Sequence, residues 1–565
     1  MDFEKLAELL FPHVTETPED LEKRYPPRAL PEGAKVTRFA PSPTGFVHFG
    51  GMYQVMIDER LAHQSGGVLF LRVEDTDARR EVPGAAQSLI RTLAHYNVRF
   101  DEGACIGEDG SIADLGPYGP FRQSQRKEIY QVFAKKLVRE GRAYPVFTTE
   151  EELEEALAAD KKTENKTKDW EAASEETRRE TLANRSITLE EAEEHLKQGH
   201  AFVLRCLSDG DGEKKVRFTD LVKGELELPE NDEDFVLLKS DGIPTYHFAH
   251  AVDDHLMGTT HVVRGEEWLP SLPKHIQLFR YLGFKQPKYL HTAQVLRLDA
   301  EGNKKKLSKR DPGAIMEDYD GMGYPPESVI EYLMTLLNSN YEEWHAQDPA
   351  KPYTDFPFSV KKMSTSGCLF DFDKLNDVSK NVISRMSAGE VLEKILAWAE
   401  TYDPDFAACL KRDPGKAEEI FSIGRGGKKP RKDFANWKDA KTFVQYFFPE
   451  YFRFEESAEG ADGKEIRLLL DEFLKTYDPA DDANGWFEKV KQIADANGYC
   501  VNMKEYREHP EQWKGSVGTV SEFIRIALTG RKNSPDLYTV MQILGREESE
   551  RRIRLYMDEV CPEGN

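Results

Sequence analysis

An apolar segment, a glycine-containing turn, a helical segment and a second apolar segment follow one another near the start of this chain. Lys35-Val-Thr-Arg-Phe-Ala40 predicts a first strand, and residues 52–64 predict a helix with its apolar residues on one side. Val68-Leu-Phe-Leu-Arg-Val73 is almost wholly apolar, which is typical of a parallel strand covered on both faces. This order predicts half of a doubly wound nucleotide-binding fold.

The turn between the first strand and the helix, Pro41-Ser-Pro-Thr-Gly-Phe-Val-His48-Phe-Gly50-Gly51, carries an imidazole and two glycines. Glycines allow a ligand to approach the backbone closely, and a helix N-terminus offers free N–H groups and the positive end of the helix dipole. A histidine before a glycine pair is, by itself, more often structural than functional. Within this longer pattern, His48, Gly50 and Gly51 are candidates for contact with a nucleotide phosphate, and we predict that His48 is also catalytic.

A second candidate phosphate site lies far downstream, in Lys305-Lys306-Leu307-Ser308-Lys309-Arg310. Ammonium groups on a short polar loop can contact the β- and γ-phosphates and follow negative charge as it develops. A solvated surface loop is the alternative interpretation of such a lysine run. We predict that Lys306 and Lys309 are catalytic, that Ser308 is a further ATP contact, and that Lys309 is the more costly lysine to lose.

Together, in this order and spacing, the two motifs resemble the HIGH and KMSKS signatures of class I aminoacyl-tRNA synthetases. The surrounding segments PSPTG, VEDTD, PTYHFA and VVRGEEW narrow the resemblance to the glutamyl-tRNA synthetase branch. Gly51 stands where HIGH has its second histidine, so any role of that imidazole is absent or supplied elsewhere. Leu307 replaces the methionine of KMSKS. The resemblance covers roughly residues 36–550.

This resemblance implies an α/β fold: a class I Rossmann-type nucleotide domain, split by an α/β connective insertion and followed by a mostly helical anticodon-binding region. Glutaminyl enzymes carry β-barrels in that last region, which the helical pattern after residue 376 does not suggest. We expect an N-terminal extension at 1–35, the halves of the Rossmann catalytic domain at 36–123 and 239–300, a connective acceptor-binding insertion at 124–238, the KMSKS loop and stem-contact region at 301–376, and the helical anticodon-binding region at 377–565.

One charged segment and two predicted strands define the predicted insertion, and an apolar segment marks where it ends. Residues 150–200 are rich in acids and poor in large apolar side chains, which predicts solvated helices. Residues 202–206 and 216–220 predict strands of the insertion. Residues 235–239 predict the return of the chain to the parallel-strand pattern.

A small acidic amino acid has two carboxylates and one ammonium group, so a selective site needs two cations and a polar or anionic partner for the amine. Arg38, Arg264 and Glu74 stand at predicted strand ends, where open parallel sheets bind ligands. The resemblance implies a role for each of the following residues: glutamate binding by Arg38, Ser42, Glu74, Tyr246, His250 and Arg264, and contact with the ATP ribose by Glu266.

His250 departs from the family pattern, because several relatives place asparagine there. Two interpretations remain open. The neutral ring hydrogen-bonds to the amino acid, or it is a packed substitute with no direct contact.

The net charge of −24 weakens a nucleic-acid hypothesis only slightly, because binding requires a local basic face rather than a basic total. The one basic cluster is Arg425-Gly-Gly-Lys428-Lys429-Pro-Arg431-Lys432. An ordinary exposed loop and a phosphate contact both remain open for it. Arg431 is the candidate tRNA contact, either with the last anticodon base or with a phosphate.

The expected cofactor is ATP with Mg²⁺ as its counter-ion, and no metal site on the protein is predicted. Many bacterial relatives carry zinc cysteines near the equivalent of Ala143-Tyr-Pro-Val-Phe-Thr148. Val146 and Thr148 stand in place of those thiols, so we predict no zinc. The six cysteines lack CxxC spacing, which favours reduced thiols in a cytoplasmic protein. Neither a signal peptide nor a membrane-spanning apolar run is recognisable.

The resulting prediction is a cytoplasmic, monomeric enzyme that joins L-glutamate to tRNA(Glu) with ATP, through a glutamyl-adenylate intermediate, and releases AMP and pyrophosphate. The resemblance also implies that tRNA must be bound before activation is efficient. A glutaminyl-tRNA synthetase and a non-catalytic tRNA-binding paralogue are the alternatives. The helical C-terminal pattern argues against the first, and intact His48, Lys306 and Lys309 argue against the second. Whether tRNA(Gln) is also a substrate stays open.

Overall fold

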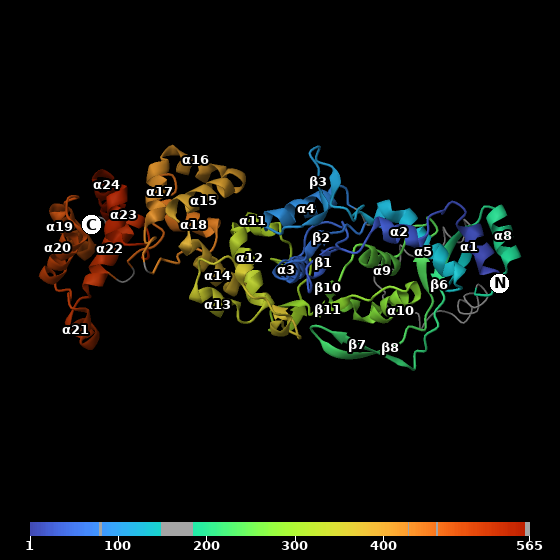
Figure 1. The fold of residues 1–565 in the computed structure, drawn as a ribbon. Coiled ribbons are helices and arrows are strands. Elements are labelled where there is room, and N and C mark those ends of the chain that lie inside the picture. The colour runs from blue at the N-terminus through green and yellow to red at the C-terminus, as the bar shows by residue number, and fades with distance from the viewer. Residues whose placement is uncertain (78–81, 149–184, 428, 459–460, 560–565) are drawn as a thin grey trace. The chain divides into compact units, whose positions relative to one another are not determined.

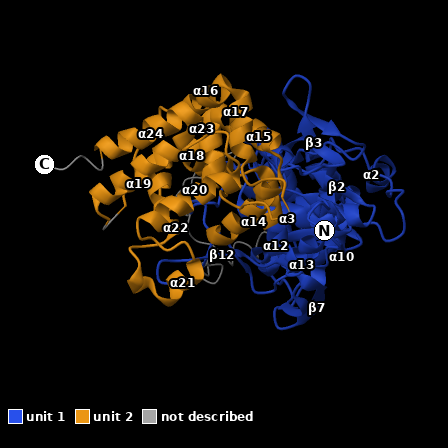
Figure 2. Ribbon diagram, turned by 90° about the vertical axis from the view of Figure 1, so that its left-hand side faces the viewer, with its two compact units in different colours: residues 1–317, 333–371 blue, residues 318–332, 372–565 orange. Residues whose placement is uncertain are grey.

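The computed structural model describes residues 1–77, 82–148, 185–427, 429–458 and 461–559. The chain forms two compact units (Figure 2). Unit 1 comprises residues 1–317 and 333–371, and unit 2 comprises residues 318–332 and 372–565.

Two sheets lie side by side at the centre of unit 1 (Figure 1). The four-stranded sheet has the order β1 (Val36–Phe39), β2 (Val68–Leu71), β3 (Glu102–Ile106) and β4 (Ile112–Leu115), and the two-stranded sheet consists of β10 (His261–Gly265) and β11 (Lys288–Thr292). Parallel pairs join β1 to β2, β2 to β3, and β10 to β11. The Thr260 N–H donates to the Val36 carbonyl at 2.9 Å, which brings β10 alongside β1. The strand order therefore reverses between β1 and β10, and open α/β sheets bind ligands at such a point.

The predicted strand, turn, helix and strand are confirmed by β1, α3 (Phe49–Gln64) and β2. The helix begins three residues earlier than the pattern indicated. Its first residue, Phe49, is fully buried, packs edge-on against Phe370 at 5.0 Å, and donates its N–H to the Ala314 carbonyl. Tertiary contacts therefore extend the helix through the two glycines, which have low intrinsic helix propensity.

Residues 202–206, 216–220 and 235–239 were all predicted to be strands, and the structure has β6, β7 and β9 at these places. One part of that prediction is wrong. The strand β9 (Phe235–Leu238) does not continue the parallel sheet; it pairs antiparallel with β6 (Ala201–Cys206), which in turn pairs with β5 (Ala143–Thr148). An apolar run indicates burial but not the partner strand. Of the segment 150–200, only residues 185–200 lie within the described residues.

The remaining elements of unit 1 surround these central sheets. The strands are β7 (Lys215–Asp220) and β8 (Gly224–Pro229), which form a hairpin, and β12 (Val295–Leu298), β13 (Lys304–Lys306) and β14 (Cys368–Leu369). The helices are α1 (Phe3–Leu10), α2 (Pro18–Arg24), α4 (Ala85–His95), α5 (Lys127–Arg139), α8 (Leu189–Lys197), α9 (Tyr246–Leu256), α10 (Leu272–Leu282) and α13 (Tyr341–Gln347), with 3₁₀ turns at η1 (Gln123–Arg126), η2 (Glu266–Ser271), η3 (Tyr353–Asp355) and η4 (Val360–Lys362).

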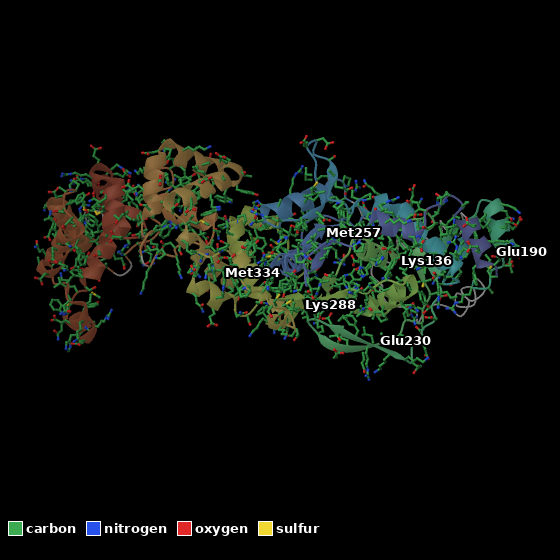
Figure 3. The ribbon with its side chains drawn as sticks, viewed as in Figure 1. Lys136, Glu190, Glu230, Met257, Lys288 and Met334 are labelled. Atoms are coloured by element: carbon green, nitrogen blue, oxygen red, sulfur yellow. The ribbon has the colours of Figure 1, made fainter. Side chains whose placement is uncertain are left out.

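The N-terminal extension packs onto unit 1 as part of its fold. The Arg28 guanidinium donates to both carboxylate oxygens of Glu102, at 2.8 and 2.9 Å, and to the carbonyl of Met257, which is labelled in Figure 3. The same guanidinium stacks 3.8 Å from the centre of the Tyr118 ring. A buried arginine with a bidentate carboxylate partner anchors this segment to the central sheet.

Unit 2 is built from helices. These are α11 (Asp318–Met322), the first part of α12 (Pro326–Leu337), α14 (Phe372–Arg385), α15 (Ala388–Tyr402), α16 (Pro404–Arg412), α17 (Pro414–Ser422), α18 (Trp437–Val444), α19 (Gly463–Thr476), α20 (Ala483–Ala496), α21 (Met503–Glu508), α22 (Val517–Thr529), α23 (Leu537–Leu544) and α24 (Arg546–Glu559), with 3₁₀ turns at η5 (Gln445–Phe447) and η6 (Pro510–Gln512). One apolar core runs through them, with Phe473, Trp486 and Phe523 among its buried residues. The predicted helical C-terminal region is confirmed. Among the described ranges, none of the helices combines the length and the apolar character that crossing a membrane requires.

Candidate active site

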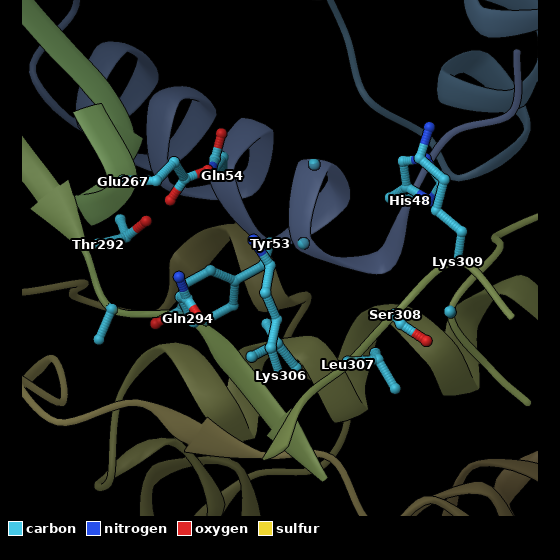
Figure 4. A pocket seen from close by; sticks show the side chains of 16 residues that line it. His48, Tyr53, Gln54, Glu267, Thr292, Gln294, Lys306, Leu307, Ser308 and Lys309 are labelled. Carbon is cyan, nitrogen blue, oxygen red and sulfur yellow. The ribbon is translucent and has the colours of Figure 1, made fainter. Parts of the chain in front are cut away.

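Two cavities open at the carboxyl ends of the central strands of unit 1. The first cavity has a volume of about 510 Å³ and is lined by His48, Gly50, Gly51, Tyr53, Gln54, Gly265, Glu267, Thr292, Ala293, Gln294, Val295, Lys306, Leu307, Ser308, Lys309 and Ala314 (Figure 4). The second cavity has a volume of about 370 Å³ and is lined by Ser42, Pro43, Thr44, Glu74, Asp75, Thr76, Asp77, Lys239, Pro244, Thr245, Tyr246 and Trp268. Both cavities thus lie where the doubly wound fold places its ligands.

His48 is the N-cap residue of α3, and its side chain makes no capping hydrogen bond to the helix. Burial lowers the pKa of His48, and the positive charge of Lys309 lowers it further. Figure 4 shows the side chains of His48 and Lys309 next to each other at one end of the first cavity. The imidazole is therefore neutral at pH 7 and available as a hydrogen-bond partner for a ligand.

Gly50 and Gly51 form the first turn of α3 on the wall of the first cavity. A Cβ atom added at Gly50 would meet no protein atom within 4 Å, and one added at Gly51 would touch only the Phe39 ring, at 3.6 Å. Neither glycine is therefore required by packing inside the protein. Because glycine has no side chain, a ligand can approach the helix N-terminus closely at both positions.

The lysine loop lies opposite this helix N-terminus. Lys306 ends β13, and the Leu307 N–H donates to the Val295 carbonyl. Asp311 closes the loop by accepting from the backbone N–H and the hydroxyl of Ser308, at 2.7 and 2.8 Å, and by pairing with Arg297. These contacts, the Ser308 N–H first, lower the pKa of Asp311 to about 2.

Lys306 and Lys309 are exposed and line the first cavity. Within the described ranges neither ammonium group has a carboxylate at ion-pair distance, whereas the neighbouring Lys305 pairs with Asp299 at 2.8 Å. The two lysines that face the cavity thus keep their full charge for an anionic ligand.

Of the two adjacent acids after β10, Glu267 lines the first cavity, and Glu266 is paired with the Lys223 ammonium. Sequence reasoning selected Glu266 and missed Glu267. A Cβ atom at Gly265 would lie 2.1 Å from a carboxylate oxygen of Glu267, so the absence of a side chain there leaves room for this carboxylate. No sequence signal distinguishes two neighbouring glutamates; their directions depend on the 3₁₀ turn η2 that follows the strand.

Ser42, Glu74 and Tyr246 all line the second cavity. The Arg72 guanidinium donates to Glu74 at 3.1 Å. Burial nevertheless raises the pKa of Glu74. Tyr246 lies between the cavity and Arg264, whose guanidinium is 3.5 Å from the tyrosine hydroxyl.

Arg38 and Arg264 lie directly behind this cavity, and neither is more than 4% exposed. The Arg38 Nε group donates to both carboxylate oxygens of Asp254 at 3.2 Å. Asp254 also accepts from Arg72 at 2.7 Å, and these two guanidinium groups hold the pKa of Asp254 well below its usual range against the effect of burial. Asp254, which the sequence analysis did not indicate, thus joins Arg38 of β1 to Arg72, the residue after β2.

Arg264 differs from every other buried arginine of the described chain. Arg38, Arg60, Arg72, Arg126 and Arg552 each have a carboxylate within ion-pair distance. Arg264 has none among the described residues; it donates instead to the imidazoles of His291 and His275, both at 3.0 Å. Its positive charge therefore has no carboxylate partner in the part of the chain that the structure describes.

His250 is fully buried, and both of its ring nitrogens face protein groups. Nε2 lies 2.9 Å from the Tyr289 hydroxyl, and Nδ1 lies 2.8 Å from the Asp254 carboxylate. Burial lowers the pKa of His250 to about 4, so the ring is neutral. The ring stacks behind Tyr246, with the two ring centres 5.8 Å apart.

Arg431 lies in unit 2, where its guanidinium makes a bidentate pair with Asp433. Its backbone N–H donates to the Gly424 carbonyl and closes the loop of basic residues. Arg425 of the same cluster is turned inward and donates to the Ile383 carbonyl. The cluster is therefore less uniformly exposed than its sequence suggests.

No metal-binding group of three or more His, Cys, Asp or Glu side chains is found among the residues that the structure describes. The donors of the first cavity are suited to anions: a helix N-terminus, ammonium groups and a neutral imidazole. The second cavity is lined by the acids Glu74, Asp75 and Asp77 and by Lys239, and guanidinium groups lie behind it. Together, these donors can position two anionic reactants and stabilise a leaving group that carries negative charge.

Family models match most of this chain. The catalytic domain described as "tRNA synthetases class I (E and Q)" matches residues 35–376, and an anticodon binding domain matches residues 431–557. The chain is 48% identical to the glutamate–tRNA ligase of Acetivibrio thermocellus, over 98% of this chain and 100% of that protein. It is 46% identical to the glutamate–tRNA ligase of Clostridium beijerinckii, over 99% of this chain and 100% of that protein.

A solved structure has the same fold. The glutamate tRNA ligase of Elizabethkingia meningosepticum, crystallised in complex with its amino acid, matches with a TM-score of 0.70 and 27% identity. The match covers 93% of this chain and 99% of that one.

Proposed function

The chain belongs to the family of class I tRNA synthetases for glutamate and glutamine, and we propose that it joins L-glutamate to tRNA(Glu) at the expense of ATP. In the first step a glutamate carboxylate oxygen bonds to the α-phosphorus of ATP, and the bond to pyrophosphate breaks. In the second step a ribose hydroxyl of the terminal adenosine of tRNA bonds to the activated carbonyl carbon, and AMP leaves. The carrying observation is the first cavity at the strand ends of unit 1, which is lined by the N-terminus of α3, His48, Lys306 and Lys309, all of them groups suited to anions.

ATP fits the first cavity. The N-terminus of α3, the neutral His48 ring, Lys309 beside it and Lys306 are suited to the phosphates. Pyrophosphate gains negative charge as it leaves, so two unpaired ammonium groups stabilise the transition state more than the ground state. Ser308 is held by Asp311, which fixes the loop between the lysines.

Glutamate fits the second cavity, because the buried charges behind it sum to a positive value. Four guanidinium groups (Arg38, Arg72, Arg126, Arg264) face three carboxylates (Asp253, Asp254, Glu74), which leaves one positive charge without a carboxylate partner among the described residues. Asp58 is also buried near Arg38, and burial raises its pKa well above the usual range, which favours its neutral form. An anionic substrate supplies the missing counter-charge. Ser42, Glu74 and Tyr246 are placed to contact the amino acid directly.

We further propose that Glu267, rather than its neighbour, contacts the ribose hydroxyls of ATP. Its carboxylate lines the first cavity, whereas Glu266 is engaged by Lys223. His250 supports the pocket from behind by contacting Asp254 and Tyr289, which favours the packed interpretation. Magnesium arrives as the counter-ion of ATP and neutralises phosphate charge there.

Unit 2 corresponds to the part of the family that contacts the anticodon, and Arg431 is the proposed tRNA contact. A zinc-free insertion rests on Val146 and Thr148 in place of thiols. The segment boundaries proposed above, the monomeric state, the cytoplasmic location and a requirement for bound tRNA before activation stay predictions.

The decisive experiment is charging of purified tRNA(Glu) with radiolabelled glutamate by the purified chain. We expect glutamyl-tRNA to accumulate with ATP and not without it. No charging by soluble, folded protein contradicts the proposal and favours a non-catalytic tRNA-binding protein.

Parallel reactions test the alternative substrates. Labelled glutamine with tRNA(Gln) must give no product, because the curated relatives cited above are glutamate enzymes and unit 2 is helical. Labelled glutamate offered with tRNA(Gln) then determines whether the enzyme charges both tRNA species. Pyrophosphate exchange with and without tRNA measures whether activation depends on bound tRNA.

A further inference from the structure

Arg264 is held in the pocket by rings that carry no charge. A guanidinium group has only donors, so each imidazole nitrogen that it contacts must be an acceptor. The Arg264 Nε group donates to Nε2 of His291, and Nη1 donates to Nδ1 of His275, both at 3.0 Å. The contacts of one arginine thus fix which ring nitrogen of each histidine lacks a proton.

The other ring nitrogen of each histidine has a partner that agrees with this assignment. Nδ1–H of His291 donates to the Asp220 carboxylate at 2.7 Å, and Nε2–H of His275 donates to Nδ1 of His247 at 2.9 Å. Asp220 is itself fixed at the end of β7 by the backbone N–H groups of Val222 and Lys223. Two chains of hydrogen bonds therefore converge on Arg264 from both sides.

The pKa shifts agree with neutral rings. Burial lowers the pKa of His291 although Asp220 opposes the shift, and burial lowers the pKa of His275 well below its usual range. Both histidines are fully buried. The Arg264 guanidinium also lies 4.7 Å from the centre of the Tyr289 ring, a further uncharged contact.

A carboxylate in the place of either histidine would orient Arg264 equally well, but it would neutralise the charge. Among the described residues, each of the other buried arginines has a carboxylate partner, and Arg264 has none. Nη2 of Arg264 has no hydrogen-bond partner in the part of the chain that the structure describes. A donor in fixed orientation, with its positive charge intact, is what a substrate carboxylate requires.

We propose that His291, with His275 opposite it, is a positioning residue for substrate glutamate: as a neutral acceptor it orients Arg264 without compensating its charge, and Asp220 holds the His291 ring in the required tautomer. The inference rests on the proposed function, because it takes Arg264 as a glutamate contact. It assigns to these three residues a role that the sequence motifs did not indicate.

Three substitutions at His291 separate orientation from charge. The Nε2 atom of histidine lies two bonds beyond Cγ, where glutamine has its amide group, so His291→Gln keeps an acceptor for Arg264. The Nδ1 atom lies one bond beyond Cγ, so His291→Asn keeps the bond to Asp220 and loses the acceptor. His291→Glu keeps an acceptor but adds the negative charge that the site lacks.

The readout is the KM for glutamate in tRNA charging, beside the KM for ATP and kcat. We expect the glutamate KM to stay within about threefold for the glutamine variant and to rise about tenfold or more for the asparagine and glutamate variants, since hydrogen bonds to charged groups have effects of that size. The KM for ATP and kcat should stay near the parent values, because uniform binding affects KM alone.

The KM for ATP detects whether a substitution at His291 displaces the strand β11 instead of acting on Arg264 alone. Thr292, the next residue of β11, lines the first cavity, so a displaced strand would raise the KM for ATP as well. Equal glutamate KM values for the glutamine and asparagine variants, or a parallel rise in the KM for ATP, overturn the inference while the parent enzyme still charges tRNA. Failure of the parent chain to charge glutamate at all overturns the proposed function and the inference together.

Discussion

At the scale of single residues, the site separates lysines that look alike in sequence. Lys304, Lys305 and Lys306 are consecutive on β13, but strand alternation places neighbouring side chains on opposite faces. Lys305 is bound by Asp299, and Lys306 lines the first cavity with Lys309. The ion pair thus distinguishes Lys305 from Lys306 and Lys309, the two lysines that we propose contact phosphate.

Replacement of Lys309 by alanine should therefore lower kcat for charging by about 10²- to 10³-fold, the usual cost of removing one donor that stabilises developing charge. Lys306→Ala should cost less, because Lys309 also lies beside His48. Steady-state charging rates measure the effect. Lys305→Ala, at a paired lysine on the same loop, is the matched control and should retain activity within about threefold. Equal losses at Lys305 and Lys309 would contradict the assignment.

At the scale of elements, the strand–turn–helix–strand unit could be predicted from sequence because its pattern is local. β1, α3 and β2 each have a continuous apolar pattern, and His48 and the glycines lie between them in the chain. The contacts of Phe49 could not be predicted, because Ala314 and Phe370 are distant in sequence. They explain why the helix begins before the glycines.

The histidines around Arg264 could not be predicted from the sequence either. His247, His275 and His291 come from α9, α10 and β11, and only the folded sheet brings them together. His291 is the cross-strand partner of Arg264 in the β10–β11 register, which no local pattern determines. Sequence therefore identified Arg264 and missed the residues that hold it.

The N-terminus of α3 gives a prediction that separates stability from binding. Gly50→Ala adds a methyl group that meets no protein atom, so the free energy of unfolding should stay within about 1 kcal/mol of the parent value. The same methyl group occupies space in the first cavity, and the KM for ATP should rise about tenfold or more. Urea unfolding and charging kinetics measure the two quantities. A destabilised variant, or an unchanged KM for ATP, would show that Gly50 is there for packing.

The partly buried His247 of α9 gives a second prediction, on pH. Burial lowers the pKa of His247 to about 4, whereas an unfolded histidine titrates near 6.5. Between these values the unfolded chain binds a proton that the folded chain does not, so this residue makes stability fall as the pH falls. The contribution is about 1.4 kcal/mol per pH unit at its steepest.

A parent-versus-variant comparison isolates this one group. His247→Gln removes the titrating ring, so the free energy of unfolding should depend less steeply on pH between about 6.5 and 5, by about that amount per unit. Urea unfolding at a series of pH values gives both slopes, and the titrating groups that are not coupled to His247 cancel in the difference. Identical slopes would mean that His247 is not held neutral by the fold.

At the scale of the whole molecule, a chain with net charge −24 must bind a polyanion through local basic surfaces. The first and second cavities lie wholly within unit 1, and Arg431 lies in unit 2. Substitutions in unit 2 that affect only tRNA contact should therefore leave the binding of the small substrates unchanged.

Arg431→Gln tests this separation and the nature of the contact. The bidentate pair with Asp433 holds the guanidinium in one orientation, so loss of the guanidinium should raise the KM for tRNA(Glu) about tenfold while the KM values for glutamate and ATP stay unchanged.

Charging of tRNA(Glu) and tRNA(Gln) side by side then distinguishes two modes of contact. An equal fall of kcat/KM for both tRNAs identifies a phosphate contact, because phosphates carry no sequence information, and a changed ratio identifies contact with an anticodon base. An unchanged KM for tRNA(Glu) would exclude Arg431 as a tRNA contact, and a raised KM for glutamate would show that the two units do not act separately in substrate binding.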